Sequence, residues 1–239
     1  MNADNGASES RMCAIIGAKG TAQATGQIGK AASLGIGLVE LRMDLVFGNC
    51  IPDFGLVGKA HENGRKCIVT FRDKKEGGAF HGEGKKALIL RAIEAGADFV
   101  DVEIAHPETI KAVAPQAKAA GCKTIGSWHD FGTKPELTKV VEAVRKANEL
   151  PVDIAKVAFA VSNEKEGKKA IAELANAAKL SGMPVVISPM GADAAKNRAY
   201  ALSLGSEFAY CILEGSEGMH GVPACSELAK NLATLTGQG

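Results

Sequence analysis

Residues 99–129 read FVDVEIAHPETIKAVAPQAKAAGCKTIGSWH, and this stretch decides the fold. The β-rich run Phe99–Ile104 precedes a segment rich in alanine and lysine, and a second β-rich run, Lys123–His129, follows that segment. Pro107 suits the first turn of a helix, and Gly121 suits the left-handed residue that ends one. A strand, a helix and a second strand in this order predict a βαβ unit, in which the two strands are parallel.

The same alternation continues along the whole chain. We expect eight strands, at Cys13–Ala18, Leu38–Leu45, Cys67–Arg72, Phe99–Ile104, Lys123–His129, Ile154–Val161, Val185–Met190 and Glu207–Leu213. The helical segments between them include Glu83–Ala95, Pro107–Ala120, Lys134–Glu149 and Glu164–Leu180. Pro135, like Pro107, fits the first turn of its helix. The glycines expected to end helices just before a strand are Gly35, Gly64, Gly96, Gly121 and Gly182.

Eight such units predict an α/β protein with a single (β/α)8 barrel over residues 12–239, because eight parallel units usually close. The length of 239 residues agrees with this, since such barrels typically need roughly 250. A doubly wound sheet is less well supported, because no glycine-rich phosphate-binding turn follows the first strand. Residues 1–11 are polar, so we expect a disordered N-terminal tail and no signal peptide.

Composition excludes several classes of function. The formal net charge of +1 gives no reason to expect nucleic acid or an anionic membrane as a partner. No apolar run approaches the ~18 residues of a membrane span. The six cysteines form no CxxC pair. Four of them fall at or in expected strands, where we predict buried thiols in a reducing, cytoplasmic compartment: Cys13, Cys67, Cys122 and Cys211. No metal site is indicated.

One lysine interrupts a very apolar strand, VDIAKVAFAV at residues 152–161. A parallel strand of this composition is expected to be buried on both faces. Burying the Lys156 ammonium is costly, so the group must be paired, deprotonated or used. A buried lysine can attack a carbonyl and form a Schiff base. The simpler interpretation is a structural ion pair at the mouth of the barrel.

Polar side chains gather on one face of several strands. Because the opposite face must pack against helices, the charged face is the barrel interior near the carboxyl ends of the strands, where barrel enzymes place their chemistry. Taken singly, each residue has a structural explanation, and we expect Asp101 and Glu103 to be counter-ions of arginines. Together they are hard to explain as packing, because burying many charges is usually worse for stability than apolar packing. The residues on this face are Glu40, Arg42, Asp44, Thr70, Arg72, Asp101, Glu103, Ser127, His129 and Lys156.

Six short motifs follow one another in a fixed order. They are VELRMD (39–44), TFRDKKEGG (70–78), DVE (101–103), SWHDF (127–131), DIAKVA (153–158) and ISPMG (187–191), with Arg198 following. In this order and spacing, across roughly residues 13 to 205, the chain resembles the type I 3-dehydroquinate dehydratases, the Schiff-base enzymes of the shikimate pathway.

The resemblance implies dehydration of 3-dehydroquinate to 3-dehydroshikimate without a cofactor or metal. Lys156 would form an imine with the ring ketone, His129 would act as general base and then general acid, and Glu76 would orient His129. Arg198 would hold the substrate carboxylate. The small-molecule substrate would be the partner, and the chain would form a homodimer. The residues that would contact the substrate are Glu40, Arg42, Arg72, Met190 and Arg198.

The segment after the last strand departs from the family. Family members carry a short lid, Ser-Ala-Pro-Gly-Gln, whose Ser and Gln contact the substrate, whereas residues 213–226 here read LEGSEGMHGVPACS. Aligning Pro223 places Gly221 and Cys225 at the Ser and Gln positions, and aligning Ser216 leaves the Gln unmatched. The loop is longer and the Gln is missing in either case. His220 is the candidate for a substitute lid contact.

Two other functions remain open at this point. An aldolase acting on a sugar phosphate would share Lys156 and would need a phosphate site after strands seven and eight, where Gly205-Ser206 gives weak support. A non-catalytic relative that binds a cyclic hydroxy acid would have lost turnover together with its lid. The intact Lys156, His129 and Glu76 argue against that second alternative.

Overall fold

The computed structural model describes residues 11–48, 50–132, 136–191, 193–216, 219 and 221–235. Its strands are β1 (Met12–Ile16), β2 (Leu38–Arg42), β3 (Lys66–Thr70), β4 (Phe99–Glu103), β5 (Lys123–Asp130), β6 (Ile154–Ala160), β7 (Val185–Met190) and β8 (Ala209–Ile212). Its helices are α2 (Gly20–Ser33), α3 (Met43–Phe47), α4 (Gly55–Glu62), the 3-10 turn η1 (Lys74–Glu76), α5 (Lys85–Glu94), α6 (Pro107–Ala119), α7 (Leu137–Asn148), α8 (Glu164–Ser181), α9 (Ala194–Ser203) and α10 (Cys225–Leu235).

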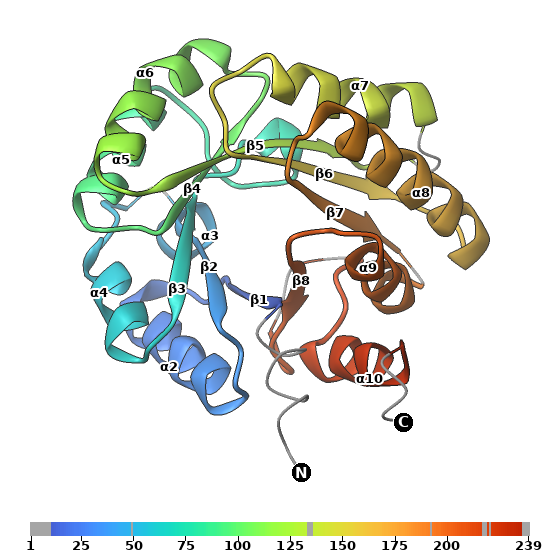
Figure 1. The fold of residues 1–239 in the computed structure, drawn as a ribbon. Coiled ribbons are helices and arrows are strands. Elements are labelled where there is room, and N and C mark those ends of the chain that lie inside the picture. The colour runs from blue at the N-terminus through green and yellow to red at the C-terminus, as the bar shows by residue number, and fades with distance from the viewer. Residues whose placement is uncertain are drawn as a thin grey trace.

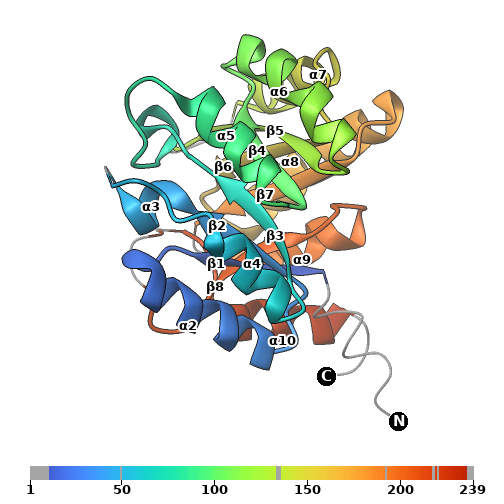
Figure 2. The same cartoon turned by 90° about the vertical axis from the view of Figure 1, so that its left-hand side faces the viewer.

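The eight strands form one parallel sheet that nearly closes on itself. Their order is β7-β6-β5-β4-β3-β2-β1-β8, and the helices lie outside the strands (Figures 1 and 2). The two end strands meet where the Glu207 amide, just before β8, donates to the Val185 carbonyl at 2.9 Å. The predicted (β/α)8 barrel is therefore confirmed.

The expected helix ends are confirmed as well. All five glycines predicted to precede strands have positive φ, between +68° and +90°. Pro107 is the first residue of α6, where its missing N–H costs nothing. Pro135 lies outside the described residues. In the part of the chain that the structure describes, no helix is long and apolar enough to cross a membrane.

The second strand is shorter than predicted. It ends at Arg42, and the next five residues form α3 instead of continuing to Leu45. The helical turn buries Met43 and Val46 among the outer helices, which an extended strand could not do for both. Asp44 consequently leaves the strand face on which we expected it, although its carboxylate returns to contact Arg42.

The barrel interior has an apolar lower part and a charged upper part. Its lower part is filled by side chains from seven of the strands, including Ile68, Ile125 and Val186, and by Phe208 just before β8. The charged residues lie toward the carboxyl ends of the strands. The expected disordered tail falls on residues 1–10 outside the described part, but the carbonyl of Arg11 accepts a hydrogen bond from the Ala209 amide at 2.9 Å.

Candidate active site

A cavity of about 250 Å³ opens at the carboxyl ends of the strands. It brings together residues from strands β2, β5, β6 and β7, the β3–η1 segment and helix α9. Every predicted site residue except His220 lines it, and His220 lies outside the described residues. The predicted residues that line the cavity are Glu40, Arg42, Arg72, Glu76, His129, Lys156, Met190 and Arg198.

Lys156 is buried and paired on several sides. Its Nζ lies 3.0 Å from Oδ2 of Asp101, 3.3 Å from Oε1 of Glu40 and 4.1 Å from the ring centroid of Tyr210. The interpretation of Lys156 as part of a structural ion pair is thus correct. Because the same amine also lines the cavity, it remains within reach of a ligand bound there.

His129 and Glu76 form a hydrogen-bonded pair, 2.8 Å between Nδ1 and Oε2. Burial, helped by the nearby Arg72 and Lys156 cations, lowers the pKa of His129 well below its usual value. The imidazole is therefore neutral near pH 7. With Nδ1–H donating to Glu76, its Nε2 lone pair is free to accept a proton. The Phe131 ring lies nearly parallel to the imidazole, with an interplanar angle of 14° and centroids 6.3 Å apart.

Arg72 is held by two carboxylates of β4. Its guanidinium contacts Asp101 at 2.7 Å and Glu103 at 2.9 Å. Burial alone would raise the pKa of Asp101, but Arg72 and then Lys156 hold it well below its usual range. Asp101 therefore stays ionised between the two cations. The expectation that Asp101 and Glu103 are counter-ions is correct for Arg72.

Arg42 does not pair with Asp101 or Glu103, so for this arginine the expectation is wrong. Its partner is Asp44, 2.8 Å away, because α3 turns that carboxylate back toward the strand end. Glu103 instead takes Lys85 of α5 as its second cation, at 2.6 Å. Glu40 accepts a hydrogen bond from Thr70 at 2.9 Å and faces Lys156. These pairings leave the polar atoms of Glu40 and Arg42 at the cavity wall.

Arg198 differs from the other cations of the cavity. Its Nε donates to the Pro189 carbonyl at 3.0 Å and its Nη1 to the Tyr210 carbonyl at 2.5 Å. Among the described residues, no carboxylate forms an ion pair with it. Burial lowers the pKa of Arg198 to about 10, which still leaves it charged at neutral pH. A buried guanidinium without a counter-ion at a cavity wall is a site for an anionic ligand group.

Several lining residues were not predicted. Phe131 belongs to a quoted motif but was given no role, and Ser188 lies two residues before Met190 on the same face of β7. Tyr210 is an aromatic residue within an apolar strand, a pattern that core packing also produces. Period-2 alternation could have indicated Ser188, whereas no sequence signal distinguishes Tyr210 from a core residue.

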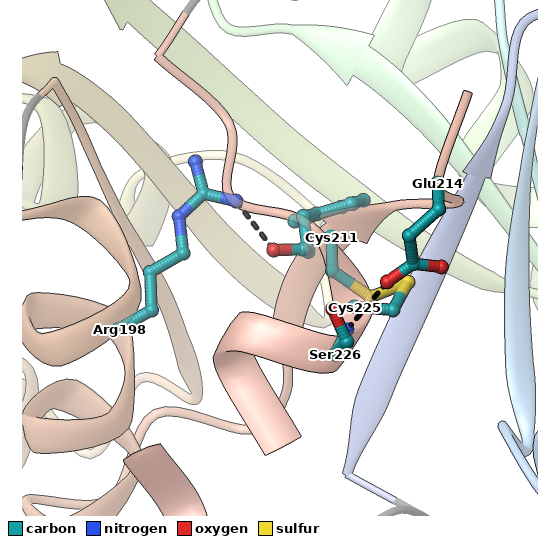
Figure 3. Close-up of a disulfide and its surroundings, with 6 residues drawn as sticks. Arg198, Cys211, Glu214, Cys225 and Ser226 are labelled. Atoms are coloured by element: carbon teal, nitrogen blue, oxygen red, sulfur yellow. Dashed lines mark hydrogen bonds between the residues drawn. A yellow bond between two sulfur atoms is a disulfide. The ribbon is translucent and has the colours of Figure 1, made fainter. Parts of the chain in front are cut away.

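The segment after β8 is tied down by a disulfide between Cys211 and Cys225 (Figure 3). The prediction that Cys211 is a free buried thiol is therefore wrong, whereas Cys13, Cys67 and Cys122 are free and buried as expected. The pairing follows from topology, since the end of β8 and the start of α10 bring the two Cα atoms within 4.9 Å. Cys225 is buried at the start of α10 and does not line the cavity.

The described part of this segment packs onto the mouth of the barrel. Met219 and Val222 line the cavity, and the Gly221 carbonyl accepts a hydrogen bond from the Gly191 amide at 3.2 Å. The Ile212 amide donates to the Pro223 carbonyl at 3.0 Å. Apolar side chains and backbone of this segment thus cover one side of the cavity.

Two clusters of described residues have the donor types of a metal site. Asp73, Glu103 and His106 lie beside the cavity, but the Lys85 ammonium already contacts both carboxylates. The second cluster is His61, Cys67 and Asp98. It lies at the opposite, amino-terminal end of the strands, away from the cavity.

A (β/α)8 barrel that places a buried lysine beside a histidine–carboxylate pair and an unpaired arginine has the architecture of a Schiff-base lyase. The chain belongs to the type I 3-dehydroquinase family, whose family model matches residues 12–238.

Curated relatives and solved structures agree with this assignment. The 3-dehydroquinate dehydratase of Methanocaldococcus jannaschii is 35% identical over 188 residues, which cover 77% of this chain and 80% of the relative. That of Methanococcus maripaludis is 31% identical over 188 residues, covering 77% of this chain and 81% of the relative. The crystal structure of 3-dehydroquinate dehydratase from Geobacillus kaustophilus has a TM-score of 0.82 at 20% identity, covering 95% of this chain and 91% of that one.

Proposed function

We propose that this chain is a lyase that dehydrates 3-dehydroquinate to 3-dehydroshikimate, the reaction of the shikimate pathway, through a Schiff base on Lys156. One observation carries the proposal: the Lys156 amine, the His129–Glu76 pair and Arg198 line the same cavity. The family assignment supplies the substrate, and the cavity supplies each chemical group that the reaction needs.

In the proposed reaction the Lys156 amine adds to the ring ketone, and loss of water gives a protonated imine. This cation draws electrons from the neighbouring C–H bond, so that Nε2 of His129 can remove that proton. The hydroxyl on the next carbon then leaves as water, with a proton returned by His129. Hydrolysis of the imine releases the enone product and restores the free amine.

The remaining residues support binding. Arg198 has no counter-ion among the described residues and suits the substrate carboxylate. Glu40, Arg42 and Arg72 present polar atoms to the ring hydroxyls, and Met190 offers an apolar contact. An aldolase acting on a sugar phosphate would use Lys156 in the same way. It fits this cavity less well, because Ser206 turns its hydroxyl to the backbone of Ile187 instead of to a ligand.

The test is to incubate the protein with 3-dehydroquinate and record the ultraviolet absorption of the conjugated enone. Adding borohydride during turnover should inactivate the protein and label Lys156, as located by peptide mass mapping. His129→Ala should lower kcat by about 10²–10⁴, the usual contribution of a positioned acid–base group, yet still form the trapped adduct. Absence of the enone, or an adduct on another lysine, would reject the proposal.

We also infer a cytoplasmic location from the biosynthetic role of the family, although a disulfide such as Cys211–Cys225 is rare in a reducing cytosol. We further infer a small-molecule substrate as the partner and no role in binding nucleic acid. The small formal charge of +1 supports the last point. The expected homodimer rests on the family resemblance alone, and light scattering after size-exclusion chromatography tests it.

A further inference from the structure

One residue of β8 contacts both cations that the proposed reaction needs. The ring of Tyr210 faces the Lys156 amine, and the Tyr210 backbone carbonyl accepts a hydrogen bond from Arg198. The Arg198 side chain points toward the strand that carries Cys211, the residue after Tyr210 (Figure 3). We propose that Tyr210 is a positioning residue, whose ring holds the Schiff-base nitrogen and whose backbone fixes the arginine. The proposal rests on the proposed function and deepens it.

The ring lies well within the range of a cation–π contact. Nζ of Lys156 is 4.1 Å from the ring centroid, and contacts of up to about 6 Å are attractive. Asp101 and Glu40 hold the same nitrogen from other directions, at 3.0 and 3.3 Å. Because the site is buried, water does not weaken the attraction between the ring face and the cation.

The ring itself cannot move away easily. Tyr210 is almost fully buried, and its ring packs edge-on against Phe208 with centroids 5.3 Å apart. Its backbone pairs in register with Cys13 of β1. A ring fixed by packing and by the sheet defines where the flexible end of the Lys156 side chain comes to rest.

An aromatic face suits a nitrogen that changes its charge and its bonds during the reaction. A third carboxylate would bind the ammonium strongly and favour the resting state over the reacting one. The ring attracts the protonated imine as it attracts the ammonium, because in both species the same nitrogen carries the positive charge. It also has no strong proton acceptor on that face, so it does not compete for the proton of the amine.

The backbone carbonyl gives Tyr210 its second contact. Nη1 of Arg198 donates to it at 2.5 Å, while Nε is held by Pro189 at 3.0 Å. Tyr210 therefore fixes the distance between two groups: the Lys156 amine, which would react with the ketone, and the Arg198 guanidinium, which would bind the carboxylate. A side-chain substitution leaves the carbonyl in place, so the two contacts can be tested separately.

The hydroxyl has no part in this role. It is buried and has no hydrogen-bond partner among the described residues. Burial raises the pKa of Tyr210 well above its usual value, so the group stays neutral. Tyr210→Phe removes only this hydroxyl, whereas Tyr210→Leu removes the aromatic face.

The experiment compares Tyr210→Phe, Tyr210→Leu and the matched control Tyr200→Leu, which removes a ring that faces another lysine, Lys168, 5.5 Å away and outside the cavity. We expect Tyr210→Leu to lower kcat by about tenfold or more, because the amine is no longer held where it meets the ketone. The fraction of Lys156 trapped by borohydride should fall in parallel. KM should stay within about twofold of wild type, because Arg198 keeps its carbonyl. Tyr210→Phe, which keeps the aromatic face, should recover most of the kcat lost in Tyr210→Leu, and Tyr200→Leu should keep the wild-type kcat.

Provided that the wild-type protein is active, three outcomes would reject the positioning role of Tyr210. They are wild-type kcat in Tyr210→Leu, an equal loss in Tyr210→Phe, and an equal loss in Tyr200→Leu. Circular dichroism checks folding, and Tyr210→Met replaces the leucine variant if that variant does not fold. A wild-type protein that shows neither turnover nor adduct would instead reject the proposed function, and this inference with it.

Discussion

At the scale of single residues, the proton of the His129–Glu76 pair is controlled by burial. Burial raises the pKa of Glu76 to about 7. Burial, together with Arg72 and Lys156, lowers the pKa of His129. As the pH falls through about 7, the first proton therefore goes to the carboxylate and not to the imidazole. A protonated Glu76 no longer offers His129 an anionic acceptor.

This order of protonation predicts the pH dependence of the reaction. We expect kcat/KM to decrease as the pH falls below about 7, because the ionised form of Glu76 is lost. Glu76→Gln should remove this acid limb and leave a lower plateau, since an amide neither titrates nor carries charge. Rate profiles of both proteins against pH provide the measurement. An unchanged acid limb in Glu76→Gln would assign that titration to another group.

The residues of the site differ in how well they could be predicted from the sequence. Lys156 could be predicted because a charge in an apolar strand has few physical explanations. Arg198 was recognised by resemblance, but only the folded chain shows that no described carboxylate forms an ion pair with it. Tyr210 could not be predicted, because an aromatic residue that faces a lysine and one that fills a core obey the same alternation.

At the scale of elements, β8 and α10 are joined both covalently and by hydrogen bonds. The disulfide links the two elements, and the Ser226 amide donates to the Glu214 carboxylate at 3.0 Å (Figure 3). The segment between them carries Met219 and Val222, which line the cavity. The covalent link therefore limits how far one wall of the cavity can move.

Removing the disulfide should destabilise the protein. Cys211 and Cys225 are 14 residues apart, and closing a loop of that size contributes about 3 kcal/mol. We expect Cys225→Ala, Cys211→Ala and the double variant to lose similar amounts of stability in urea denaturation, because each removes the same bond. Cys50→Ala, at an exposed free cysteine, is the control. Additive losses in the double variant would show that the two sulfurs are not bonded in solution.

The elements themselves were largely predictable, and their ends less so. Helix α8 matches its expected range to one residue, because Asn163 caps its start and Gly182 its end. The change from β2 to α3 at Arg42 was not predictable, because it depends on what Met43 and Val46 pack against. The disulfide was missed for a similar reason: the spacing of 14 residues carries no pattern, and only the return of the chain brings the two cysteines together.

At the scale of the whole molecule, the upper part of the barrel is a balanced set of charges contributed by different strands. Lys156 of β6 is shared by Glu40 of β2 and Asp101 of β4. Asp101 also has Arg72, but Glu40 has no other cation in an ion pair among the described residues. Lys156, which we propose forms the Schiff base, is therefore also the counter-ion that makes the Glu40 carboxylate of another strand tolerable inside the barrel.

Because of this charge balance, we expect that replacing Lys156, which should abolish the proposed chemistry, also lowers the stability of the fold. Lys156→Met should destabilise the fold by about 3 kcal/mol, because it removes the cation that, among the described residues, forms the ion pair with the buried Glu40 carboxylate. Glu40→Gln in the same chain should recover most of the loss, since a neutral amide can keep the hydrogen bond to Thr70. Lys139→Met, which removes an exposed ion pair with Glu136, should cost little and serves as the control.

Urea denaturation of the four proteins distinguishes the two explanations for a buried lysine. If Lys156 served the chemistry alone, replacing it by an apolar side chain would remove an expensive buried charge, and the single variant would match or exceed the wild type. If it also balances charge, the single variant falls and the double variant recovers, although neither turns over substrate. If the double variant is as unstable as Lys156→Met alone, the loss of stability comes from poor packing around position 156 and not from the unpaired Glu40 carboxylate. The pattern of recovery, more than the size of the loss, shows that the same positive charge serves both the fold and the reaction.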